Sequence, residues 1–219
     1  MTRGTLGATA AALSCITISS AAHAAVLLRS AEMADGAGHR YQPGFGVPGP
    51  GSYSPTTYSA AVAFPNDTRN FAAPGPDGLR IVANSIATFS HSIGNSLSES
   101  WTARKFEVKF DLEEPAEFKY TRSIVDVFDS LAPVTLQADG QPPVDGLPPR
   151  FGEKSGVLPA GHYTFSGVAD LQGLSPWGGT DRFLTAWGGY NVVLTVAPEP
   201  TALPVLGGLM VFALRRRRG

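Results

Sequence analysis

The clearest pattern in the chain is an alternation of charged and apolar residues with a period of two. Between Lys105 and Leu112 each apolar residue is separated from the next by one charged residue. In a β-strand this alternation places the apolar side chains on one face and the charges on the other, whereas a helix would scatter both sets. The break Glu113-Glu114-Pro115 and the renewed alternation over Glu117–Ile124 predict a hairpin.

Other short segments have strand-like patterns, and none between the two ends of the chain has a helical period. They are Ser59–Phe64, Ile81–Phe89, Val134–Ala138, His162–Val168 and Tyr190–Val196. Short strands separated by Gly/Pro turns predict an all-β fold, namely an antiparallel, jelly-roll-like β-sandwich over residues 81–197. Residues 25–80 are expected to be an irregular Pro/Gly-rich stretch, because seven of the nine residues in Pro43–Gly51 are Pro or Gly.

The first 24 residues have the organisation of a secretory signal peptide. Arg3 provides a positive start, Leu6–Ile18 is an apolar or small-residue run, and Ala22-His23-Ala24 gives the small-x-small pattern before a cut at Ala25. A buried N-terminal helix and a lipoprotein cut before Cys15 are the competing interpretations. Signal peptidase is therefore an expected processing partner, and the body is expected to be exported.

The C-terminal segment, residues 198–219, has the pattern of a short membrane anchor. Pro198-Glu199-Pro200 precedes an apolar run, Ala202–Leu214, which is followed by the four consecutive residues Arg215, Arg216, Arg217 and Arg218. As a transmembrane helix the apolar run would be about 21 Å long, short of the ~30 Å hydrocarbon core, and snorkelling arginines would compensate. Arginines stay on the cytoplasmic side, so this pattern predicts an inner-membrane segment with the body outside.

The combination of Pro198-Glu199-Pro200, a short apolar helix and Arg215–Arg218 resembles the PEP-CTERM sorting signal of Gram-negative bacteria. The resemblance implies cleavage by an exosortase and release to, or attachment at, the surface of a cell that makes extracellular polysaccharide. The body, roughly Ile81–Val196, is similar to the β-sandwich modules found in such proteins. An uncleaved tail anchor is the competing interpretation.

Composition limits the classes of partner. The chain has 17 basic and 18 acidic residues, and removing Arg3 and the four tail arginines leaves the body acidic. A nucleic-acid-binding protein needs a basic surface, so nucleic acid is not expected as a partner. The single cysteine, Cys15, lies in the predicted signal peptide and excludes a disulfide framework within the chain.

Catalytic and metal-binding motifs are missing from the sequence, and we predict that the protein is not an enzyme and has no cofactor. The predicted mature chain has no cysteine and no Gly-x-Ser-x-Gly motif. Its three histidines, His39, His91 and His162, form no zinc-binding motif. Ser90-His91-Ser92 is not a triad, because neighbours on a strand face opposite ways.

Carboxylates leave two alternatives open. Asp139-Gly140 and Asp145-Gly146 lie on one Pro-rich loop that is suited either to Ca²⁺ or to plain turns. The pairs Glu113/Glu114 and Asp126/Asp129 are the candidates for a small secreted glycosidase, which needs two converging carboxyl groups.

The tryptophans suggest a different activity. Trp177 and Trp187 each precede two glycines, and an exposed Trp on a Gly-rich loop can stack against a sugar ring. The competing interpretation is that each Trp, like Trp101, closes an end of the sandwich. The sequence therefore predicts an exported structural or adhesive protein, with carbohydrate binding through Trp177 and Trp187 as the alternative and extracellular polysaccharide as a possible partner.

Overall fold

The computed structural model describes residues 26–44, 49–75, 77–94, 96–124, 133–149, 151–172 and 183–198. These residues form eleven strands: β1 Val26–Pro43, β2 Ser52–Tyr58, β3 Val62–Ala63, β4 Phe71–Gly75, β5 Gly78–Ile93, β6 Ser96–Leu112, β7 Ala116–Ile124, β8 Val134–Ala138, β9 Gly152–Leu158, β10 Gly161–Asp170 and β11 Phe183–Pro198. The predicted signal helix and transmembrane helix lie outside the described residues.

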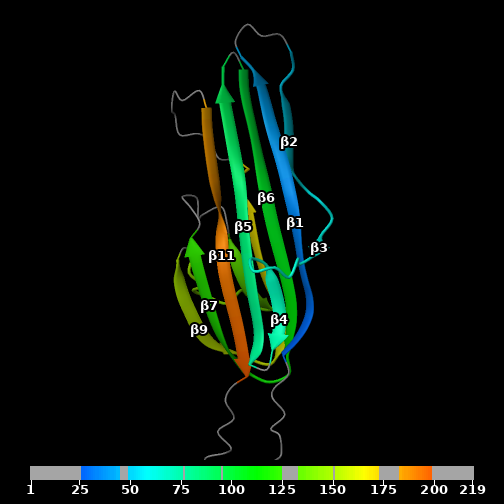
Figure 1. Ribbon diagram of the computed structural model, residues 1–219, viewed down its shortest axis with the longest axis vertical. Coiled ribbons are helices and arrows are strands. Elements are labelled where there is room, and N and C mark those ends of the chain that lie inside the picture. The colour runs from blue at the N-terminus through cyan, green and yellow to red at the C-terminus, as the bar shows by residue number, and fades with distance from the viewer. Residues whose placement is uncertain are drawn as a thin grey trace, which may run out of the picture.

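All eleven strands belong to one antiparallel sheet, in which β2-β1-β6-β5-β11-β7-β9 is the main order (Figure 1). No helix occurs among the described residues. The predicted all-β, antiparallel architecture is therefore confirmed. The jelly-roll sandwich stays a prediction, because hydrogen-bonded pairing joins the strands into one sheet.

The sheet branches at β6, and we call this point the fork. Above the fork, Leu97–Trp101 of β6 pairs with β5. Below it, Ala103–Leu112 pairs with β10 instead, while β5 continues beside β11. We call the half in which β5 pairs with β6 the distal half, and the half that contains Val26 and Pro198 the proximal half; in Figure 1 they lie at the top and bottom.

In the proximal half the two arms of the fork pack against each other through aromatic side chains. Phe106 on β6 lies 5.4 Å from Tyr190 on β11, and Tyr120 on β7 lies 6.2 Å from Phe165 on β10, measured between ring centroids. All four side chains are buried. Each large apolar side chain buried in this way contributes roughly 1.5–3 kcal/mol, so this interior holds the arms together.

The same face of β6 is therefore used in two ways. Below the fork its even-numbered residues Phe106, Val108 and Phe110 point into the interior and are buried. Above the fork no described strand covers that face, and the even-numbered residues Ser98, Ser100 and Thr102 are exposed. Because side chains alternate strictly between the two faces of a strand, the face of β6 that is buried below the fork is the same face that is exposed above it.

The N-terminal part of the body is not irregular, which corrects the prediction for residues 25–80. β1 spans 18 residues and pairs along its whole length with β6. Its inward positions include Gly36 and Gly38, which lie opposite Tyr58 and Trp101. Because the aromatic rings of neighbouring strands fill this space, β1 lacks the large apolar residues that signal a strand. The Pro/Gly cluster does mark the connection from β1 to β2.

The predicted hairpin after Leu112 is also wrong. β6 belongs to one arm, whereas β7 pairs with β9 and β11 in the other arm. The Glu113-Glu114-Pro115 connection therefore crosses between the arms. Two acidic residues and a proline are compatible both with a hairpin turn and with a crossing between the arms. The alternation before and after this connection therefore could not distinguish the two possibilities.

Candidate functional site

The most distinctive surface of the described chain is a set of six hydroxyl side chains on the distal half, which we call the hydroxyl face. It consists of Thr88, Ser90 and Ser92 on β5 and of Ser98, Ser100 and Thr102 on β6. Five of these residues are exposed and Ser92 is half-buried. The sequence produces this face because hydroxyl residues alternate with larger ones on both strands.

Pairing of β5 with β6 brings these hydroxyls together in rows across the strands. Ser90 is directly opposite Ser100, and their Oγ atoms lie 2.7 Å apart. Ser92 is opposite Ser98 in the same register. Neighbouring strands of a sheet are roughly 4.8 Å apart, and alternate residues on one strand are separated by about 6.8 Å. The hydroxyl face is therefore a regular lattice of groups that both donate and accept hydrogen bonds.

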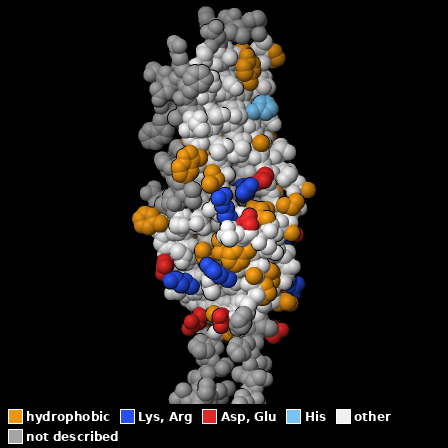
Figure 2. Space-filling view, in the orientation of Figure 1, with side chains coloured by type: hydrophobic (Ala, Val, Ile, Leu, Met, Phe, Trp, Pro, Cys, Tyr) orange, Lys and Arg blue, Asp and Glu red, His pale blue; other side chains and the backbone are white. Residues whose placement is uncertain are grey.

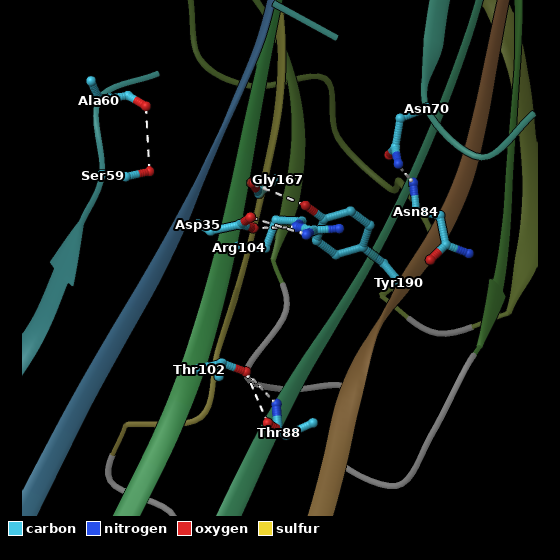
Figure 3. A network of polar contacts seen from close by, with 10 residues as sticks. All are labelled: Asp35, Ser59, Ala60, Asn70, Asn84, Thr88, Thr102, Arg104, Gly167 and Tyr190. Atoms are coloured by element: carbon cyan, nitrogen blue, oxygen red, sulfur yellow. Dashed lines mark hydrogen bonds and ion pairs between the residues drawn. The ribbon is translucent and has the colours of Figure 1, made fainter. Parts of the chain in front are cut away.

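The lowest row of the hydroxyl face closes the fork. The Thr102 hydroxyl accepts a hydrogen bond from the backbone N–H of Thr88 at 2.7 Å, and the two Oγ1 atoms lie 3.0 Å apart (Figure 3). Backbone pairing of β5 with β6 ends one residue above, at Phe89 and Trp101. The Thr102 hydroxyl thus bonds the backbone N–H of Thr88, which would otherwise be left to solvent where β6 separates from β5.

No charged side chain belongs to the hydroxyl face. In Figure 2 the blue and red side chains lie below the uncharged distal surface. The first ion pair below the Thr88–Thr102 row joins Arg104 Nη2 to Asp35 Oδ2 at 3.1 Å (Figure 3). Hydrogen bonding to Asp35 raises the pKa of Arg104, so this pair stays ionised. On the side of the sheet that carries the hydroxyl face, this ion pair lies just below the fork.

Aromatic and imidazole side chains flank the hydroxyl face. Trp187 on β11 is directly opposite Thr88, and 44% of it is exposed. His39 on β1 is directly opposite Ser100 and is also exposed. Trp187 therefore lies where a ligand on the hydroxyl face would meet it. Trp177, the other predicted sugar contact, lies outside the described residues.

The opposite side of the same strands is buried and supports the hydroxyl face. Phe89, His91 and Trp101 alternate with the hydroxyl residues and are 1%, 3% and 4% exposed. His91 Nδ1 lies 3.4 Å from Glu99 Oε1, on the neighbouring strand. His91 is thus a buried residue beside a carboxylate, and Ser90 and Ser92 point away from it.

Trp101 is held by a polar network that fastens β2 to the end of β10. Its Nε1–H donates to Thr56 Oγ1 at 2.8 Å, and Thr56 Oγ1 in turn donates to Asp170 Oδ1 at 3.0 Å. Gln172 accepts the Thr56 backbone N–H at 3.0 Å. Burial, followed by the charge of Asp170, raises the pKa of Tyr58 to about 12. These groups bond one another, so the network has a structural role and fixes Trp101 beneath the hydroxyl face.

The remaining histidine forms a second cluster in the proximal half. His162 Nδ1 lies 2.6 Å from Asp111 Oδ1, and Arg29 binds the other carboxylate oxygen. Burial alone would raise the pKa of Asp111, but hydrogen bonds from His162 and Arg29 hold that pKa below its usual value. Asp111 is therefore a charged anchor between three strands.

The predicted acidic candidates do not converge. Glu113 and Glu114 are exposed on the crossing between the arms, and Asp126 and Asp129 lie outside the described residues. Asp139 and Asp145 are exposed, and the glycines after them have positive φ angles of 69° and 72°, as turns require. Within the described chain no three His, Cys, Asp or Glu residues group around a possible metal position.

The predicted processing residues lie mostly beyond the described strands. Pro198 ends β11 opposite Ala116, whereas Glu199, Pro200 and Arg215–Arg218 are outside the described residues, as are Ala22, Ala24 and Ala25. Among the residues that the structure describes there is no helix with the length and apolar character needed to cross a bilayer.

Sequence reasoning missed the hydroxyl face, although its signal is present. Hydroxyl residues recur at every second position over 88–92 and again over 96–102, on both sides of the Gly94-Asn95 pair. A search for alternating large apolar residues misses such segments, because the residue type that repeats in them is a hydroxyl residue on the exposed face. Searching for Ser/Thr with period two would have found both strands.

Comparison of the chain with models of known protein families, with curated proteins and with solved structures finds no match. The geometry of the hydroxyl face and the placement of Val26 and Pro198 therefore carry the functional proposal.

Proposed function

We propose that this chain is an exported protein of the cell surface or extracellular matrix, sorted and processed by an exosortase, with a non-catalytic structural or adhesive role. The signal-peptide pattern before Ala25 and the combination of Pro198-Glu199-Pro200 with Arg215–Arg218 support export and sorting. Before processing, the C-terminal segment would hold the protein in the inner membrane.

One observation carries the adhesive part of this proposal, namely the position of Val26 and Pro198, the first and last described residues, at the pole opposite the hydroxyl face. Val26 at the start of β1 pairs with Leu112, and Pro198 at the end of β11 pairs with Ala116. Leu112 and Ala116 are joined by the short crossing between the arms, so Val26 and Pro198 both lie at the proximal pole (Figure 1). A sorting tail that leaves from this pole places the hydroxyl face away from the anchor.

The fork suits this role. We propose that the proximal half works as a β-sandwich, in which the two arms cover each other's apolar faces and form a rigid base. The distal half is then a sheet that projects from this base. One face of this sheet is exposed and lined by hydroxyl groups, and the other is buried around Trp101.

Fractionation of the native host, with and without its exosortase, tests the proposal. We expect the protein in the surface or medium fraction of the wild-type host and in the inner-membrane fraction without the exosortase. Intact-mass analysis should show a mature chain that lacks both residues 1–24 and Arg215–Arg218. A surface-located chain that retains the four arginines would contradict exosortase processing and favour a permanent anchor.

A second candidate function, carbohydrate binding, is favoured by the exposure of Trp187 beside the hydroxyl face. A buried Trp187 would have supported the alternative that it closes an end of the fold. Secretion as a small glycosidase has no such support, because Glu113 and Glu114 lie on an exposed connection.

A further inference from the structure

We propose that the hydroxyl face, together with Trp187 at its edge, is a binding site for a neutral polysaccharide. This inference rests on the proposed function and specifies the ligand of its adhesive surface. The chain of the polysaccharide would lie across the strands, with one sugar ring against Trp187 and its neighbours over the Thr88–Thr102 and Ser90–Ser100 rows.

The first argument compares two exposed faces of the same strand. In the proximal half, the exposed residues of β6 are Lys105, Glu107 and Lys109. Charged side chains of this kind are what a solvated strand ordinarily presents. In the distal half the exposed residues are Ser98, Ser100 and Thr102, which lie on the opposite face of the strand. Both sets of residues are open to water, so contact with solvent alone does not explain why one set is charged and the other carries hydroxyl groups.

The second argument concerns charge. None of the six residues of the hydroxyl face is a cation that could hold an anionic polymer, and the Asp35–Arg104 pair below its lowest row is neutral overall. Its donors and acceptors match a ligand that is itself covered with hydroxyl groups. A nucleic acid would need basic residues, and a protein partner would need an apolar interface centre. A neutral glycan is the polymer whose chemistry complements this surface.

The third argument is the position of Trp187. Trp187 and Thr88 are cross-strand neighbours, so the indole ring and the Thr88–Thr102 hydroxyl pair belong to one row. The ring offers a flat apolar surface to the C–H face of a sugar, while the row offers hydrogen bonds to its hydroxyl groups.

The hydroxyl groups are already solvated, which determines the kind of binding expected. Each hydrogen bond to a sugar replaces one to water, so a single contact adds little affinity. Binding should therefore depend on several rows at once and be stronger for polymers than for single sugars.

The test is affinity electrophoresis of the full-length chain in mild detergent. The gels contain dextran or hydroxyethyl cellulose as neutral polysaccharides, or alginate as an anionic one. We expect at least one neutral polymer to retard the wild-type chain and alginate to have no effect. Trp187→Ala should weaken retardation about tenfold, and Ser100→Lys should abolish it, because the lysine stands in the middle of the rows.

Phe151→Ala is the matched control, because Phe151 is 76% exposed and lies on the proximal half. This variant should bind like the wild type, and circular dichroism of all three variants should report the wild-type fold. Two results would overturn the inference: no retardation by either neutral polymer, or equal retardation of the wild type, Trp187→Ala and Ser100→Lys. Either result leaves surface location in the native host unaffected, so failure of the ligand assignment is distinguishable from failure of the proposed function.

Discussion

Replacing Gly38 with alanine tests the packing that supports the distal half. A Cβ atom at Gly38 would lie 2.5 Å from Cε2 and 2.6 Å from Cζ2 of Trp101. These atoms belong to a rigid ring that is 4% exposed and is bonded through Nε1 to Thr56. The ring cannot rotate away without breaking that hydrogen bond. The added methyl group must therefore separate β1 from β6 or displace the indole.

Overpacking of this kind costs typically 1–3 kcal/mol. We expect Gly38→Ala to lie near the upper end, about 2–3 kcal/mol, because the clash comes with the loss of the Trp101–Thr56 hydrogen bond. For a chain of this size each kcal/mol corresponds to a fall of roughly 2–4 °C in the unfolding midpoint. The measurement is urea unfolding followed by tryptophan fluorescence.

Gly94→Ala is the matched control, since a Cβ at Gly94 would meet nothing within 4 Å. It should be neutral or slightly stabilising, because alanine restricts the unfolded chain. In the double variant Gly38→Ala/Trp101→Leu, the smaller side chain should make the two effects less than additive. An unfolding midpoint of Gly38→Ala equal to that of the wild type would refute the proposed packing of Trp101 on β1.

Three further results are expected. The pKa of Asp111 is lowered in the folded protein, so its charge stabilises the fold above the unfolded pKa of about 4, and this stabilisation is lost as the pH falls through the folded pKa. Asp111→Asn should therefore lower the unfolding midpoint at pH 7 but not at pH 2. An equal loss at both pH values would contradict the ion pairing. Burial raises the pKa of Tyr120 to about 12, so wild-type stability should fall as the pH rises above about 10; Tyr120→Phe should fall less steeply in a pH series of thermal melts, and parallel curves would count against that burial. Thr56→Val removes the acceptor of Trp101 Nε1–H and should cost about 1–3 kcal/mol in urea unfolding, whereas the exposed control Thr57→Val should cost little.

The sequence was most informative where large apolar residues alternate with charges. Val134–Ala138 was predicted with its observed bounds, and the segment 105–112 lies within β6 with the predicted inward face. The alternation there is strong because Phe106, Val108 and Phe110 pack against the other arm, and large apolar side chains are needed to fill that space. The prediction of an all-β antiparallel fold follows from such segments.

Strands with small inward residues escaped prediction. Gly36 and Gly38 give β1 no apolar period, although each lies opposite an aromatic residue on the neighbouring strand. That compensation is a property of the pair and is invisible in either strand alone. The sequence also did not indicate which strands β7 pairs with, because nothing in residues 113–115 shows that the chain crosses to the other arm.

Of the candidate site, sequence reasoning found Trp187 but not the surface beside it. The exposure of Trp187 follows from its position on β11 opposite Thr88, and this requires the register of strands that are about a hundred residues apart in the chain. The sorting residues stay a prediction from the terminal pattern.

The long C-terminal strand also has a mechanical consequence. β11 runs from the distal half to the proximal pole and is hydrogen-bonded to β5 on one side and to β7 on the other. Hydrogen bonds of antiparallel strands lie perpendicular to the strand axis. Tension between a tail at Pro198 and a ligand at the distal end therefore shears many of these bonds together, instead of opening them one by one. Stretching single molecules through the C-terminal end should give a high rupture force, and a low force with gradual opening would show that β11 peels away.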